Sequence, residues 1–131
     1  MKSYTDLEQS QKLAKILPLE SADMWWSRCT ITDFGDGVLK VSYAVEPCNI
    51  SQFRNTKEDI PCWSLAALIG VLPRSIEFKD DKYYLRFMKG YVEYANDEVS
   101  ITGIYLHTTG NDNLVDACYE MIIRLNELNL L

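Results

Sequence analysis

The tight succession of strand-like runs in the second half of the chain is what most limits the fold. Ile76–Lys79, Tyr83–Met88 and Tyr91–Ala95 are rich in β-branched and aromatic residues, and only the polar turns at Asp80–Asp81 and Lys89–Gly90 separate them. Parallel neighbours need a crossover connection of about a dozen residues, whereas antiparallel neighbours are joined by turns this short. The pattern therefore predicts consecutive antiparallel strands.

A further strand is predicted over Glu98–His107, after a turn at Asn96–Asp97. Its apolar residues change face halfway along the run. One extra residue in a strand has this effect, and glycine relieves the strain of the extra residue. We therefore expect a β-bulge at Thr102–Gly103.

A second pair of strands is predicted in the first half of the chain. Trp25–Ile31 and Val38–Val45 alternate between apolar and polar residues, and the loop Asp33–Gly37 between them is rich in residues that tolerate positive φ. This arrangement predicts a β-hairpin. The polar stretch Glu46–Ile60 that follows has no periodicity and is expected to be a surface loop.

Two helices are predicted before the last run of strands. Thr5–Glu8 matches a capping box, which begins a helix over Asp6–Leu17 that Pro18 ends. Prolines also bracket the segment Pro61–Pro73, which is apolar nearly all round. We expect this second helix to be buried on more than one side.

The last predicted helix is amphipathic and runs over Asn113–Leu128, capped by Asp112 or Asn113. Ile123 lies off its apolar seam and needs a second contact or is exposed. The residues of the seam recur at steps of four and three: Leu114, Cys118, Met121, Leu125 and Leu128. Val115 and Ile122 are expected to widen this seam on one side.

The elements follow in the order α-β-β-α-β-β-β-β-α, without the β-α-β rhythm of a parallel nucleotide-binding sheet. We therefore expect the α+β class, with an antiparallel sheet of about five to six strands and about three helices packed on it. A length of 131 residues is that of one domain, so residues 1–131 are predicted to form a single domain.

The composition limits the partners and the cellular location that we expect for this protein. Apolar residues make up 47% of the chain and the net charge is −6, without a cluster of Lys or Arg, so no direct contact with nucleic acid is expected. The polar start lacks the apolar region of a signal peptide, and the longest apolar stretch, Leu65–Leu72, is too short to span a membrane. We therefore expect a cytoplasmic protein that has no contact with a membrane and whose cysteines are reduced.

The potential metal ligands are widely spaced along the chain. Structural zinc sites usually take pairs of ligands from tight turns, and no such pair occurs. We therefore expect no metal and no cofactor. The ligand types present are Cys29, Cys48, Cys62, Cys118 and the sole histidine, His107.

Cys62 is the most specific candidate for a catalytic residue. It follows Pro61 at the start of a predicted helix, where the helix dipole favours a thiolate, and His107 is a potential base. A core cysteine and a histidine at a strand end explain the same residues more simply, so we expect no enzymatic activity.

Aromatic residues are predicted on both faces of the strands. Trp25 and Trp26 are adjacent and therefore face opposite sides, and Tyr84 lies opposite Tyr83. Such a sheet is either covered by helices on both faces or presents an apolar patch to a partner. The candidate binding residues are Trp26, Arg28, Tyr84 and Ile123.

Three segments together resemble a known group of sequences: Leu17–Met24, Ile60–Leu68 and Asp112–Ile122. They are similar to a group of small uncharacterised proteins from gut Bacteroidetes genomes, often encoded among phage-like or mobile-element genes. The resemblance implies a bacterial or phage cytosol as the setting. The group has no known activity, so the resemblance implies no site residues.

The sequence favours a non-enzymatic accessory or protein-binding module. Its partner, another protein or a second copy of the chain, would bind an aromatic sheet face or the acidic C-terminal helix. Two alternatives stay open. One is a small-molecule-binding domain with a pocket between the sheet and the helix at residues 61–73, and the other is a cysteine-dependent enzyme that uses Cys62 and His107.

Overall fold

The computed structural model describes residues 2–32, 39–47, 59–96, 104–108 and 113–131. The described chain has the α+β class expected from the sequence, with antiparallel pairing throughout. Its elements are α1 (Leu7–Leu13), the 3-10 turn η1 (Leu19–Ser21), β1 (Met24–Thr32), β2 (Leu39–Pro47), β3 (Ile60–Cys62), α2 (Leu65–Val71), β4 (Ser75–Phe78), β5 (Asp81–Met88), β6 (Tyr91–Ala95), β7 (Ile104–His107) and α3 (Leu114–Glu127).

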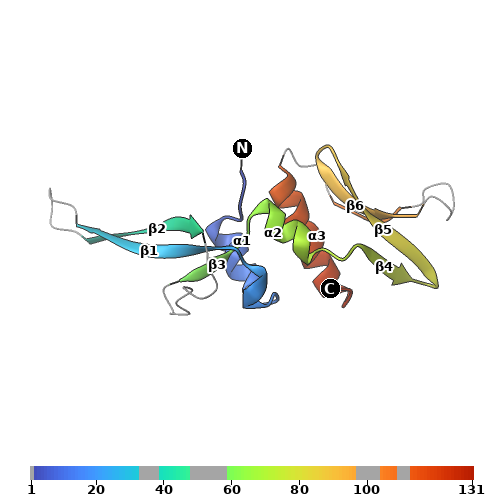
Figure 1. Ribbon diagram of the computed structural model, residues 1–131, viewed down its shortest axis with the longest axis horizontal. Helices are drawn as coiled ribbons and strands as arrows, with labels where there is room; N and C mark the ends of the chain where they lie inside the picture. Colours follow the sequence, from blue (N-terminus) through green and yellow to red (C-terminus); the bar gives the residue numbers. More distant parts are fainter. Residues whose placement is uncertain (1, 33–38, 48–58, 97–103, 109–112) are drawn as a thin grey trace.

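The strands form two sheets rather than the single sheet expected. One has the order β2-β1-β3 and the other the order β4-β5-β6-β7. They lie at opposite ends of the molecule with the helices between them (Figure 1). The short strand β3 pairs with the base of β1, and α2 then carries the chain across to β4. Turn lengths predict which consecutive strands pair, but not whether the strands before and after a helix belong to one sheet or to two.

The strand bounds agree closely with the alternating runs. β1 and β2 form the predicted hairpin, and β6 has the predicted ends. Pro61 and Cys62, expected at the start of a helix, instead belong to β3. The described ladder shifts register at Tyr94/Ala95, whereas the predicted bulge at Thr102–Gly103 lies outside the described residues. The hairpin loop at residues 33–37 and most of the loop at residues 46–60 also lie outside them.

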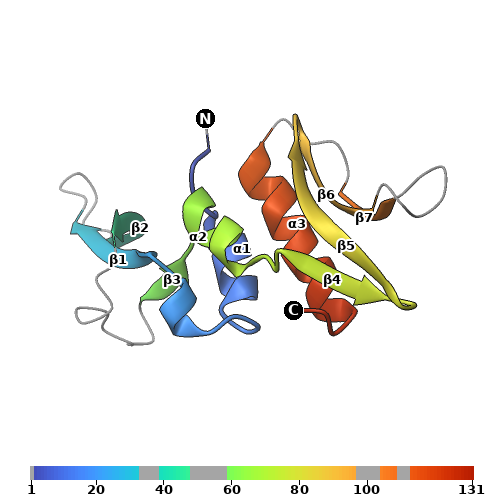
Figure 2. The ribbon, with the colours of Figure 1, turned by 45° about the vertical axis from the view of Figure 1, so that its right-hand side comes forward.

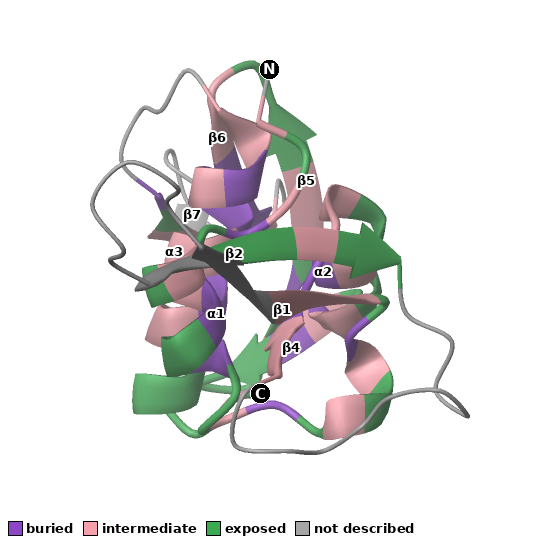
Figure 3. Ribbon diagram, turned by 90° about the vertical axis from the view of Figure 1, so that its left-hand side faces the viewer, coloured by how far each residue is buried: buried purple, intermediate pink, exposed green. Residues whose placement is uncertain are grey.

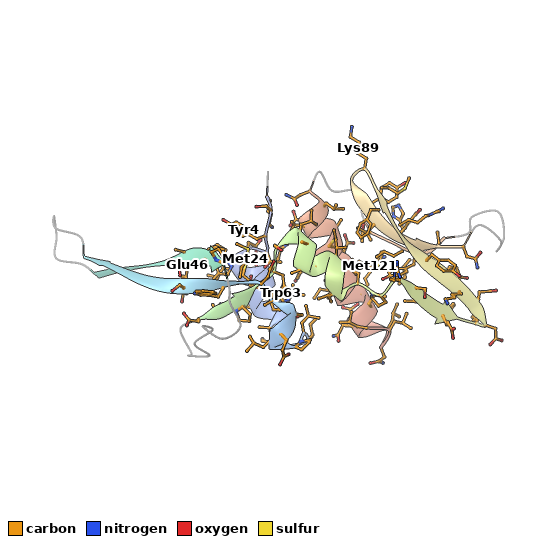
Figure 4. The ribbon with its side chains drawn as sticks, in the orientation of Figure 1. Tyr4, Met24, Glu46, Trp63, Lys89 and Met121 are labelled. Carbon is orange, nitrogen blue, oxygen red and sulfur yellow. The ribbon has the colours of Figure 1, made fainter. Side chains whose placement is uncertain are left out.

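The helical layer fills the space between the sheets. α3 packs along one face of the β4–β7 sheet and also against α2, while α1 packs against β3 (Figure 2). The buried side chains form one continuous cluster, with Leu13 and Trp63 on the side of α1 and Val92 and Tyr94 on the β4–β7 sheet. Figure 4 shows Trp63 near the middle of the molecule and Met121 on the side of the larger sheet.

α3 is the central helix of this core. Asn113 caps it by accepting a 2.8 Å hydrogen bond from the Val115 N–H, as one of the two predicted caps. Val115 and Ile122 widen the buried seam as predicted, and Ala117 is buried in addition. Leu128, the last residue of the seam, is 46% exposed. α3 therefore joins both halves of the core and does more than cover one sheet.

α1 begins one residue later than expected. Its capping box is formed by Asp6 and Gln9. The Asp6 carboxylate accepts a 2.8 Å hydrogen bond from the Gln9 N–H, and the Gln9 side-chain oxygen accepts a 3.1 Å hydrogen bond from the Asp6 N–H. Thr5 is buried instead, where its hydroxyl lies 2.7 Å from the Ser10 hydroxyl and accepts a 3.1 Å hydrogen bond from the Trp63 N–H. Thr5 therefore bonds to the buried Ser10 hydroxyl and to the Trp63 backbone instead of capping α1. α1 also ends at Leu13, short of the predicted Leu17.

α2 is shorter and more exposed than predicted. Ser64 caps it by accepting a hydrogen bond from the Ala67 N–H. Leu68 is its buried residue, whereas Ile69 and Gly70 are exposed. In Figure 3, which colours the chain by burial, the helices have exposed and intermediate parts as well as buried ones. The expectation of burial on more than one side was wrong, because small residues make a helix look apolar without requiring that each face be covered.

The N-terminal segment is fastened to the helical layer. The Lys2 ammonium donates hydrogen bonds of 2.7 Å to Asp116 on α3, 3.1 Å to Asp6 and 2.9 Å to Gln9. Partial burial opposes ionisation of Asp116, but the hydrogen bonds from Lys2 and Gln9 outweigh it and lower the pKa of that carboxyl. The backbone of Thr5 donates a further 2.9 Å hydrogen bond to the Trp63 carbonyl.

Within the described residues, no helix has both the length and the apolar character that crossing a membrane requires.

Candidate functional site

The β4–β7 sheet has two different faces. Tyr83, Val92 and Tyr94 point to the inner face and are buried under α3. On the opposite face Tyr84 is 53% exposed and Met88 is 44% exposed. In Figures 1 and 2 none of the other described elements lies against this second face. Among the described elements, a helix therefore lies against one side of the sheet only. On the other side Tyr84 and Met88 are exposed, whereas Glu93 and Ala95 are buried, each 3% exposed.

The register brings further residues onto this exposed side. Met88 pairs with Tyr91, Arg86 pairs with Glu93, and Glu93 pairs with His107. Directly opposed residues of antiparallel strands share a face of the sheet. We use the name outer face for the side-chain set Tyr84, Arg86, Met88, Tyr91 and His107.

An ion pair lies at the centre of the outer face. Arg86 Nε and Nη2 lie 3.1 and 3.0 Å from Glu93 Oε1, and Glu93 is only 3% exposed. A buried carboxylate without a partner is costly, and its pairing with a planar guanidinium satisfies it and also fixes the orientation of Arg86. Next to the pair, the Tyr91 and His107 rings lie 4.3 Å apart between centroids. The middle of the outer face is therefore ordered before any partner binds.

A shallow hollow of about 490 Å³ lies beside Tyr84. Asp80 and Asp81 bring negative charge to its wall, while Lys82 and Arg86 bring positive charge. The Lys82 ammonium lies 5.8 Å from the centroid of the Tyr84 ring. Because both signs of charge are present, the hollow resembles the polar rim of an interface more than a phosphate-binding pocket.

The four binding residues predicted from the sequence do not come together. Trp26 and Arg28 lie on β1 in the smaller sheet, and Tyr84 lies on β5 in the larger one. The Trp26 indole N–H lies 3.3 Å from the Thr5 carbonyl and 3.2 Å from the Ser10 hydroxyl, so it is engaged within the fold. Ile123 packs against the core. Tyr84 alone occupies the outer face.

The sequence contained part of the information needed to find the other residues of the outer face, which were not predicted as binding residues. Arg86 and Met88 follow Tyr84 at intervals of two, so alternation along one strand places them on its face. Tyr91 and His107 belong to other strands, and their position depends on the register. No pattern within one strand gives that register.

Cys62 and His107, the candidate catalytic pair from the sequence, do not lie near each other. Cys62 lies at the end of β3 and His107 at the end of β7, in sheets on opposite sides of the helical layer (Figure 2). Cys62 is fully buried, with its sulfur 3.4 Å from the Thr5 carbonyl oxygen. Burial raises the pKa of the Cys62 thiol, which is the opposite of what a nucleophile requires.

We expect the two buried thiols to resist labelling in the folded protein. Cys62 and Cys118 are free, and burial also raises the pKa of Cys118, to about 12. A raised pKa leaves little thiolate at about pH 8, and burial blocks the reagent. The measurement is the reaction with dithionitrobenzoate of a Cys29→Ser/Cys48→Ser variant, folded and then in urea. Rapid labelling of Cys62 in the folded state would revive the enzymatic alternative.

One of the acidic residues of α3, Asp116, is engaged within the fold. Asp116 accepts hydrogen bonds of 2.7 Å from Lys2 and 2.8 Å from the Gln9 side chain. Among the residues that the structure describes, no group of three or more His, Cys, Asp or Glu side chains is placed to hold a metal ion. The outer face is thus the stronger of the two binding surfaces considered.

No protein-family model, no curated protein and no solved structure matches this chain, so the functional argument depends on the geometry of the molecule itself.

Proposed function

We propose that this protein is a non-enzymatic accessory module that binds a protein partner through the outer face of the β4–β7 sheet. The observation that carries the proposal is the exposure of Tyr84 and Met88 on a sheet face that no other described helix or strand covers. An uncovered sheet face with large apolar side chains is a common sign of an interaction surface.

The composition of the outer face supports a protein partner. Tyrosine, methionine and arginine are enriched in protein interfaces, and the side chains that dominate binding energy are often Tyr or Arg. Tyr84, Arg86, Met88 and Tyr91 are of these types. The ion pair with Glu93 holds Arg86 in place, so less side-chain entropy is lost when a partner binds.

The other surfaces and chemistries are weaker candidates. The acidic α3 residue Asp116 is already paired, and Cys62 is buried far from His107. A net charge of −6 does not favour direct nucleic-acid binding. The setting that we propose is the cytosol of a bacterium or its phage, as the sequence resemblance implies, with the gene of phage or mobile-element origin.

The test compares three baits in a pull-down from cells of the source organism. They are the wild type, Tyr84→Ala/Met88→Ala, and a control Tyr43→Ala/Leu128→Ala. The control removes a tyrosine and an aliphatic side chain of similar exposure elsewhere, at 38% and 46%. We expect a protein that the wild type and the control retain and that the outer-face variant loses.

Two results would contradict the proposal. One is the retention of the same proteins by all three baits. The other is the absence of any protein that the wild type and the control both retain, together with a wild type that stays monomeric in solution. Sedimentation of the purified wild type over a range of concentrations covers the remaining case, in which the partner is a second copy. Self-association that the outer-face variant abolishes supports the proposal in that form.

A further inference from the structure

A second hollow lies away from the outer face, against the exposed side of α2. It has a volume of about 600 Å³, within the range of about 300–1,000 Å³ that is usual for small-molecule sites. Its apolar lining includes Ile16 and Leu17 after α1, Ala67 and Val71 on α2, and Leu131 at the C-terminal end. We propose that this hollow, the α2 groove, binds an uncharged and mainly apolar small molecule.

The position of the groove differs from the pocket expected from the sequence. That pocket was placed between the sheet and the helix at residues 61–73. The observed groove does use α2, but its other walls come from the segment after α1, from the η1 turn, from the end of α3 and from Leu131. No residue of either sheet lines it. The residues of these walls therefore determine which class of ligand fits the groove.

The lining residues carry no ionisable side chain. An apolar wall without a counter-charge disfavours an ionic ligand, because the charge would lose hydration without compensation. The polar side chains of the lining are Ser21 and Asn126. The Ser21 hydroxyl donates to the Pro18 carbonyl at 2.6 Å and accepts from the Trp63 indole N–H at 2.9 Å. A few fixed polar groups in an apolar wall are what orient a neutral ligand.

Gly70 keeps the groove open along α2. A Cβ atom built at this position would meet no atom within 4 Å. The backbone there has no need of positive φ, so glycine is not required by local conformation. The missing side chain therefore leaves space beside Ala67 and Val71 that any larger residue would narrow.

The extent of the groove favours a small molecule over a protein. Nine residues line it, whereas a stable protein interface usually engages about 20–30 residues on each side. This proposal is independent of the proposed function, because the groove and the outer face share no residue.

The test uses Nile red, a neutral apolar dye whose fluorescence rises in apolar sites. We expect saturable binding at one site of the wild type. Gly70→Trp fills the groove from α2 and is expected to weaken binding by about tenfold or more, which equals about 1.4 kcal/mol. Ala66→Trp is the matched control, because Ala66 is exposed on the same helix but does not line the groove.

Two further measurements make the outcome decisive. Asn126→Trp narrows the groove from its α3 wall at an exposed position, so it replaces Gly70→Trp if that variant does not fold. Octanol should displace the dye and octanoate should not, which tests the preference for a neutral ligand. The proposal fails if the wild type shows no saturable binding, if folded groove variants bind the dye as the control does, or if octanoate competes equally.

Discussion

A chain that ends at Asp112 is expected to lose cooperative unfolding entirely. Such a truncation removes α3, whose buried side chains belong to the same cluster as Trp63 on one side and Tyr94 on the other. Without them the β4–β7 sheet has no partner for its inner face, and a sheet of this size needs a packed apolar face to be stable. The measurements are circular dichroism and thermal unfolding, in which the truncated chain should show no transition.

The control for this truncation is a chain that lacks only Leu131. This residue is 43% exposed, so its removal should leave a cooperative transition. A chain ending at Asp112 that still unfolds cooperatively would mean that α3 docks onto an already folded body. That result would also make α3 a candidate for release when a partner binds.

Replacement of Trp63 by alanine is expected to cost about 3–5 kcal/mol of unfolding free energy. Trp63 has no exposed surface and lies among residues of the core cluster. The substitution leaves a large cavity and removes the donor to the Ser21 hydroxyl. Because domains are stable by only about 5–15 kcal/mol, this loss will bring the protein close to unfolding. Urea denaturation followed by circular dichroism measures it.

Two variants separate cavity formation from the mere loss of an aromatic ring. Trp63→Phe fills part of the space and should cost less than Trp63→Ala. Tyr84→Ala removes an aromatic side chain that is 53% exposed and should change stability by about 0.5 kcal/mol or less. A loss below about 1 kcal/mol for Trp63→Ala would contradict the central position of Trp63 in the core.

Periodicity was sufficient wherever a structural element is determined by its own residues. The runs around Tyr83–Met88 and Tyr91–Ala95 became paired strands, and the last helix begins within one residue of its predicted start. Alternation also placed Tyr84 correctly on the face opposite Tyr83. At Tyr83–Tyr84 and along the last helix one face is buried and the other is more exposed, so the hydrophobic pattern indicates the orientation of these elements.

The misplaced features depend on contacts between distant segments. Thr5 has the sequence of a local cap, but its hydroxyl bonds to Trp63, which lies far along the chain. Cys62 has the sequence of a helix start, but the pairing of β3 with β1 makes it part of a strand. The outer face likewise depends on the register of three strands, and Tyr91 and His107 meet only because of that register. A single sequence contains no direct record of such pairings.

The central place of α3 also affects how the protein is made. A ribosome delivers both sheets before it delivers residues 114–127, yet those residues complete the core that the two halves share. Until then, the inner-face residues Tyr83, Val92 and Tyr94 lack the α3 side chains that cover them. Uncovered apolar strands of this kind are prone to aggregation and are what chaperones recognise. Folding of the two sheets into one core is therefore delayed until α3 has emerged, and we expect the nascent sheets to need protection until then.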